Sequence, residues 1–162
     1  MTSFALLKTR RFLPLFVTQF LGAFNDNLFK NALVIWITFK AQRVWGLPPE
    51  QAVALCGGIF ILPFFLFSAT AGQVADAYDK ARLIRWVKLA EIGIMGFAVW
   101  GWLSGAISFL LLVLFGMGMH STFFGPLKYS ILPQHLAEDE LLGGNALIES
   151  GTFLAKIGRA HV

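Results

Sequence analysis

Long apolar stretches constrain this chain more than any other feature of its sequence. A bilayer core about 30 Å thick is crossed by roughly 20 consecutive, mostly apolar helical residues. The sequence supplies four such stretches, at about residues 12–39, 52–72, 83–103 and 106–124, and a fifth apolar stretch begins at about residue 141. The chain is 57% hydrophobic and only 14% charged, whereas soluble domains are roughly 25% charged. We therefore predict an all-α, polytopic membrane helix bundle.

The basic residues are distributed as expected for a membrane protein. The net charge is +4, but the basic residues lie at the ends of apolar stretches and form no stripe that would bind nucleic acid. With a cytoplasmic N-terminus, the outer loops hold only Lys40 and Arg43, and the inner loops hold Lys8, Arg10, Arg11, Lys80, Arg82, Arg85 and Lys128. Positive residues favour the cytoplasmic side, so we predict that the N-terminus is cytoplasmic.

The sequence shows no pattern of soluble enzyme chemistry. Cys56 is the only cysteine, so neither a disulfide framework nor a cysteine metal cluster is expected. His135 and Asp139 are separated by three residues, whereas the acyltransferase signature needs four so that the carboxylate can orient the histidine base. The glycines of GMGMHS lie in an apolar stretch without a preceding strand, unlike those of a dinucleotide-binding loop. We expect no active site, no cofactor and no metal within this chain.

The first apolar stretch carries polar residues in its middle. Gln19, Asp26 and Lys30 follow a spacing of seven and four, so they share one helical face, with Asn27 at its margin. A charge near the bilayer centre costs about 2.5–3.5 kcal/mol on insertion scales, so it should face protein or water. Asp26 and Lys30 also stand in the order that favours a helical ion pair. We predict that these four residues line a substrate or proton pathway; the alternative is a pair that only neutralises itself.

A second group of candidate residues lies between the second and third stretches. Gly72 and Asp76 are followed by the basic residues Lys80 and Arg82. Glycine allows helices to approach closely, and an aspartate here can cap a helix or pair with an arginine. The alternative interpretation is a simple charged turn between two spans.

Other polar residues are weaker candidates. Glu149, four residues after Asn145 in the fifth stretch, is predicted to line the same cavity as the first-stretch residues. Lys88 and Glu91 are three residues apart near the cytoplasmic end of the third stretch, and we expect them to pair and extend toward the surface. His120 is interpreted as an interfacial or packed histidine rather than a proton relay.

Several motifs resemble those of a known family. GQVADAYDKARL resembles the loop signature of the major facilitator superfamily, with Ala77 and Asp79 where that signature has a basic residue and a glycine. With TQFLGAFNDN, GPLKYSILPQHL and GGNALIESGTFLA, the chain resembles the bacterial lysophospholipid transporter branch of that superfamily. The resemblance covers most of residues 1–156 and implies part of the N-terminal half of a major facilitator fold.

The resemblance also implies a function. A protein of this kind would move lysophospholipid across the bacterial inner membrane by alternating access, with that substrate and membrane lipids as its partners. Some members of this branch are fused to a phospholipid acyltransferase, so the alternative is the membrane portion of a bifunctional acyltransferase, with the enzyme fused or separate. A facilitator for a soluble metabolite or drug and an inactive fragment are further alternatives.

The last six residues, IGRAHV, differ from the stretch before them. They are polar and charged where a fifth apolar helix would continue, and one set of codons for them matches a common sequencing-library adapter. We therefore expect residues 157–162 to be a sequencing artefact.

Overall fold

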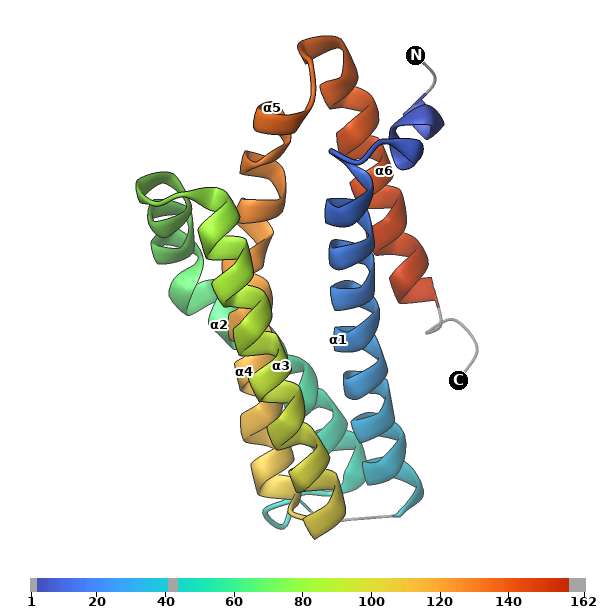
Figure 1. The fold of residues 1–162 in the computed structure, drawn as a ribbon. Coiled ribbons are helices and arrows are strands. Elements are labelled where there is room, and N and C mark those ends of the chain that lie inside the picture. Colours follow the sequence, from blue (N-terminus) through green and yellow to red (C-terminus); the bar gives the residue numbers. More distant parts are fainter. Residues whose placement is uncertain (1–2, 41–43, 158–162) are drawn as a thin grey trace. The chain divides into compact units, whose positions relative to one another are not determined.

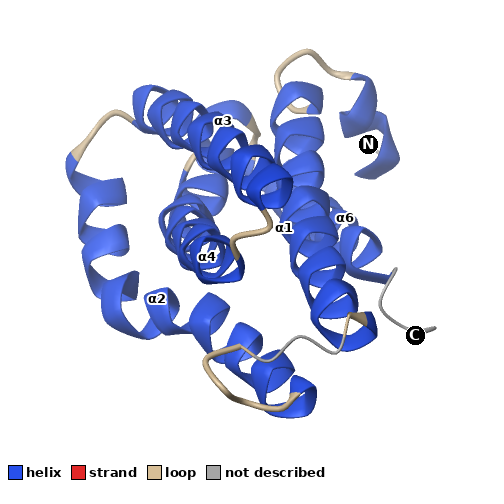
Figure 2. Ribbon diagram, turned by 90° about the horizontal axis from the view of Figure 1, so that it is seen from below, coloured by secondary structure: helices blue, strands red, loops and turns tan. Residues whose placement is uncertain are grey.

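The computed structural model describes residues 3–40 and 44–157, so Arg43 and residues 158–162 of the tail lie outside the described residues. The elements are η1 (Ser3–Lys8), α1 (Leu13–Phe39), α2 (Pro49–Ala77), α3 (Lys80–Ser104), α4 (Ile107–Ser130), α5 (Leu132–His135) and α6 (Glu138–Lys156) (Figure 1). Within these ranges there is no strand, and only an isolated bridge joins Val44 and Leu47 (Figure 2). The predicted all-α fold is confirmed.

The chain divides into two compact units. The terminal unit contains residues 1–28 and 128–162, and the middle unit contains residues 29–127. The first half of α1, α5 and α6 therefore belong to the terminal unit. The second half of α1, together with α2, α3 and nearly all of α4, belongs to the middle unit.

In the terminal unit, α6 runs beside the first half of α1 (Figure 1). Their apolar side chains, with those of η1 and α5, form a core of Leu6, Phe12, Leu132, Leu136, Leu147 and Ile148. Gly151 allows the close approach, because a Cβ atom there would lie 2.9 Å from both Nε2 of Gln19 and Cε2 of Phe16. Small residues at a helix interface are a common means of packing membrane helices closely.

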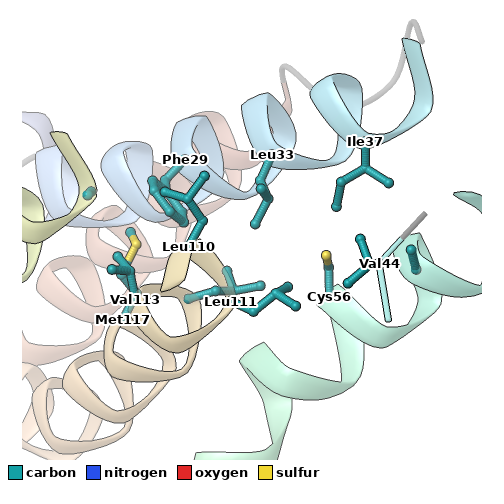
Figure 3. Packing of buried hydrophobic residues seen from close by; sticks show 12 residues of the cluster. Phe29, Leu33, Ile37, Val44, Cys56, Leu110, Leu111, Val113 and Met117 are labelled. Atoms are coloured by element: carbon teal, nitrogen blue, oxygen red, sulfur yellow. The ribbon is translucent and has the colours of Figure 1, made fainter. Parts of the chain in front are cut away.

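The core of the middle unit joins α1, α2 and α4. Figure 3 shows Phe29, Leu33 and Ile37 of α1 facing Leu110 and Leu111 of α4, with Cys56 of α2 close by. Two turns further along α4, Gly118 lies against the backbone of α2, because a Cβ at this position would overlap the carbonyl oxygen of Phe60. Helix α2 bends along its length, and Pro63 lies inside it (Figure 2).

Two of the described helices are long and apolar enough to cross a membrane. Helix α2 reaches a mean hydropathy of 2.2 over 18 residues and α4 reaches 1.8. Much of α2 is exposed and apolar, with 81% of Phe65 accessible, as a surface that faces lipid would be. These two helices coincide with the second and fourth predicted spans. Helices α1 and α3 coincide with the first and third, whose crossing of the membrane stays a prediction.

The helix ends differ from those expected in two places. Helix α2 continues to Ala77, so Gly72 and Asp76 lie in its last turns and not in a connecting loop. Helix α4 continues to Ser130 with Pro126 inside it, whereas the fourth apolar stretch of the sequence ends at about residue 124. A proline removes one backbone hydrogen bond, and such helices persist where neighbouring groups satisfy the freed carbonyl.

Candidate functional site

A buried amide of α1 holds α6 in the terminal unit. Gln19 is only 2% exposed, and its Nε2 donates a hydrogen bond to the backbone carbonyl of Ile148 over 3.2 Å. The hydroxyl of Thr152 lies 3.0 Å from Oε1 of Gln19 and 2.8 Å from the same carbonyl, so its single proton serves one of these acceptors at a time. Gln19 is therefore buried against α6, and its predicted role in a transport pathway stays a prediction.

A cation and a carboxylate extend this group of polar residues. Nζ of Lys128 lies 3.5 Å from the Thr152 hydroxyl and 3.8 Å from Oε1 of Glu149, and 4.8 Å above the ring of Tyr129. The Lys128 side chain is 14% exposed, whereas that of Glu149 is 45% exposed. The group therefore offers a partly covered ammonium, a more accessible carboxylate, a hydroxyl and an amide. We call Gln19, Lys128, Glu149 and Thr152 the polar cluster.

Asn27 makes a second amide contact between α1 and α6. It is 8% exposed, and its Nδ2 donates to the carbonyl of Ala155 over 3.1 Å. Asn27 is eight residues after Gln19, so the two amides stand about two helical turns apart on neighbouring faces of α1. Thr152 was not identified from the sequence, although it follows Glu149 by three residues and so lies on nearly the same side of α6.

The structure assigns Asp26 and Lys30 to different units. Asp26 is partly buried in the terminal unit, whereas Lys30 belongs to the middle unit, where its Nζ lies 5.0 Å above the ring of Phe60. An ammonium over an aromatic face is attracted by the ring quadrupole. The ion pair between Asp26 and Lys30 stays a prediction.

The residues of the loop signature surround the turn between α2 and α3. Asp76 is exposed, and Lys80 begins α3. Asp79, not Asp76, caps α3, because its Oδ1 accepts a hydrogen bond from the backbone N–H of Arg82 over 2.8 Å. The local structure of this turn therefore depends on Asp79, which occupies the position where the signature has a glycine.

An ion pair at the start of α6 was not foreseen. Nη2 of Arg11 lies 2.6 Å from Oε1 of Glu140, and its Nη1 donates to the carbonyl of His135 over 3.2 Å. Oε2 of Glu140 accepts a hydrogen bond from the backbone N–H of Ala137. That hydrogen bond, followed by the nearby guanidinium, lowers the pKa of Glu140 from its ordinary value. The N-terminal segment is thereby tied to the turn before α6.

A further charged group lies in the middle unit. Nζ of Lys88 is 2.7 Å from Oε2 of Glu91, which confirms the predicted pair. Nε2 of His120, on α4, lies 3.4 Å from the same oxygen. His120 is packed, as expected, but its position beside Glu91 joins two helices and has no signal in the sequence. Within residues 3–40 and 44–157, no group of three His, Cys, Asp or Glu is placed to hold a metal ion.

The chain is similar to named transporters. It is 31% identical over 152 residues to the lysophospholipid transporter LplT of Cronobacter sakazakii (strain ATCC BAA-894), an alignment that covers 92% of this chain and 34% of the relative. It is 30% identical over 143 residues to LplT of Salmonella heidelberg (strain SL476) and of Salmonella typhi, covering 88% of this chain and 33% of each relative. The chain thus spans about a third of the length of these curated relatives.

No family model matches the chain, and no solved structure matches it. The transporter relatives and the two long apolar helices together indicate a membrane protein.

Proposed function

We propose that this chain is part of a lysophospholipid transporter of the major facilitator superfamily in the bacterial inner membrane, with its N-terminus in the cytoplasm. The observation that carries the proposal is the similarity to LplT, which extends over 92% of the chain and so includes both units. The four motifs identified in the sequence lie in the same region. Substrate would move by alternating access, as one half of the transporter rocks against the other.

The polar cluster suits the headgroup of such a substrate. A lysophospholipid with an ethanolamine headgroup carries a phosphate and an ammonium group. The ammonium of Lys128 would bind the phosphate, and the more exposed carboxylate of Glu149 would bind the substrate's ammonium. The Lys128–Glu149 distance of 3.8 Å is longer than a hydrogen-bonded ion pair, so the two side chains can separate to admit a ligand.

Asp26 and Asn27 of the terminal unit and Lys30 of the middle unit are further candidates for contact with the substrate. Each lies in a helix of high apolar content, where a polar side chain has to face protein or water. The exposed apolar side chains of the helices would accommodate the single acyl chain. No enzyme chemistry is assigned to these residues.

The proposal is tested by substrate uptake in the full-length protein. We expect Lys128→Gln and Asp26→Asn each to lower the uptake of lysophosphatidylethanolamine by proteoliposomes at least about tenfold, the effect of losing roughly 1.4 kcal/mol of interaction. Lys8→Gln, which removes a positive charge outside the cluster, is the matched control. If Lys128→Gln and Asp26→Asn both take up substrate as fast as the wild type at equal protein level, the proposed site is refuted. If the wild-type protein itself takes up no lysophosphatidylethanolamine, the proposed function is refuted.

The alternative is the membrane portion of a bifunctional phospholipid acyltransferase. It differs from a dedicated transporter in the coding sequence after residue 156. Reading the genomic DNA past this codon distinguishes the two. Further spans followed by a histidine, four residues and an aspartate would identify a bifunctional acyltransferase. A stop codon after about twelve spans in all would identify a dedicated transporter.

A further inference from the structure

Three ionisable side chains meet inside the middle unit, and the proposed function does not use them. Oε2 of Glu91 lies 2.7 Å from Nζ of Lys88 and 3.4 Å from Nε2 of His120, so one carboxylate oxygen faces two basic groups. The side chains of Lys88, Glu91 and His120 are 18%, 15% and 3% exposed. Lys88 and Glu91 come from α3 and His120 from α4, so the group links the two helices.

The imidazole of His120 is buried without a hydrogen bond. Both of its ring nitrogens are covered, and neither makes a hydrogen bond to any residue that the structure describes. Its ring stacks against that of Phe124, with the centroids 6.1 Å apart and the planes at 9°. A buried polar group without a partner is costly. A protonated imidazole would relieve part of this cost, because its Nε2–H could donate a charge-assisted hydrogen bond to Glu91 after a small shift.

Lys88 also contacts the aromatic ring of Phe124. Its Nζ lies 4.2 Å from the centroid of the Phe124 ring, within the range of a cation–π interaction. If Lys88 moves away from Glu91, the ring still stabilises its charge. The carboxylate then still faces His120.

The other charged side chains of α3 are Lys80, Arg82 and Arg85, which lie in its first two turns. The charged groups that act on His120 are Glu91 and Lys88, both from α3. Helix α2 carries only Glu50 in its first turn and Asp76 near its end. On α1, Lys30 lies over the ring of Phe60. The charged side chains that act on His120 are therefore the two other members of the group.

We propose that Lys88, Glu91 and His120 form a proton-binding site, in which His120 takes up a proton as Lys88 leaves Glu91. Nε2 of His120 accepts the proton from water, and the new N–H bond donates to Oε2 of Glu91. The ammonium of Lys88 moves away from Glu91 and stays over the face of Phe124, where it already lies. Two positive charges beside one carboxylate repel each other, so the two basic groups occupy Glu91 in turn. This differs from the sequence-based interpretation of His120 as an interfacial or packed histidine rather than a proton relay.

The site is tested by nuclear magnetic resonance of the full chain in detergent micelles, with the histidines labelled at carbon Cε1. Spectra are recorded from pH 4 to pH 9, and the His120→Gln variant identifies the signal of His120. The exposed His135 is an internal control in the same sample. The measurement needs no transport, so its result is independent of the proposed function.

Two substitutions should move the transition of the His120 signal in opposite directions. Lys88→Gln should move its midpoint to higher pH by about one to three units, and Glu91→Gln should move it to lower pH by a similar amount. The midpoint of His135 should stay constant. A His120 midpoint that is the same in the wild type and both variants would overturn the proposal, and so would a signal that never titrates in Lys88→Gln.

A third variant covers the case in which a charge substitution prevents folding. Phe124→Leu keeps an apolar side chain but removes the ring on which Lys88 would rest. Lys88 should then remain at Glu91, and the His120 midpoint should move to lower pH. A midpoint equal to that of the wild type in Phe124→Leu would contradict the exchange of partners.

Discussion

The hydroxyl of Thr152 lies 3.0 Å from Oε1 of Gln19, although 133 residues separate them in the chain. Nε2 of the same glutamine donates to the carbonyl of Ile148, one helical turn before Thr152. A single buried amide of α1 therefore binds both a side chain and the backbone of α6. Among apolar helices, such contacts contribute to the stability and the register of packing.

We predict that Gln19→Leu lowers the free energy of unfolding by about 1 kcal/mol, because interhelical hydrogen bonds in membranes are typically worth this much or less. Thr152→Val should have a smaller effect, since Gln19 keeps its contact with Ile148. The double variant should lose less stability than the sum of the two single variants, because both substitutions remove the same interaction. Unfolding in mixed detergent micelles measures all three. Fully additive losses would show that the two side chains do not interact.

Gly118→Ala should destabilise the middle unit by about 1–3 kcal/mol, the usual cost of overpacking. The added methyl group would overlap the backbone carbonyl of Phe60, and a backbone atom cannot move aside as the end of a flexible side chain can.

Gly116→Ala is the matched control on the same helix. Its Cβ would lie 3.8 Å from the side chain of Ile94, an ordinary contact, and alanine favours a helix by up to about 1 kcal/mol over glycine. Thermal unfolding in detergent should therefore show a lower midpoint for Gly118→Ala only. Equal midpoints for the two variants would contradict the close approach of α2 and α4 at this position.

Contacts within one helix could be predicted from the sequence. The pair Lys88 and Glu91 is confirmed because helix periodicity alone brings residues three apart together. The apolar stretches likewise predicted the order of the long helices, since a length of about 20 apolar residues indicates a span directly.

Contacts between helices could not be predicted in the same way. Glu91 meets His120, and Arg11 meets Glu140 across 129 residues, only after the helices pack. No spacing in a single sequence encodes such pairs. Helix ends also depended on context, because Pro126 lies inside α4 although proline usually indicates a boundary.

The stability of the terminal unit should depend on pH through Glu140. Its pKa in the folded chain is lowered from the ordinary value of 4.5, first by the hydrogen bond from the Ala137 N–H and then by Arg11. A lowered pKa means that the folded state favours the ionised carboxylate. This contribution is fully present above pH 4.5 and is lost as the pH falls through the lower, folded pKa.

Glu140→Gln should therefore lower the midpoint of thermal unfolding at pH 7, and the difference from the wild type should shrink as the pH falls from 4.5 toward 3. Glu138→Gln removes the same charge from an exposed side chain in the same helical turn and serves as the control. A difference between Glu140→Gln and the wild type that is constant from pH 7 to pH 3 would contradict the assigned ionisation.

Two aspartates in the turn between α2 and α3 should have separable effects. Asp79→Ala removes the acceptor for the Arg82 N–H at the N-terminus of α3, a loss that typically costs about 1 kcal/mol. Asp79→Asn keeps a side-chain oxygen at this position and should retain most of the stability. Asp76→Ala changes an exposed side chain, so its free energy of unfolding should stay within about 0.5 kcal/mol of the wild type.

Uptake by the full-length protein separates the roles of the two residues. If Asp76, a residue of the loop signature, takes part in transport, Asp76→Ala should lower lysophospholipid uptake while the midpoint of unfolding stays unchanged. Asp79→Asn should transport normally, because capping needs only an acceptor oxygen. The reverse pattern, with normal uptake by Asp76→Ala and impaired uptake by Asp79→Asn, would assign the functional aspartate to the helix cap and exclude the residue that the signature identifies.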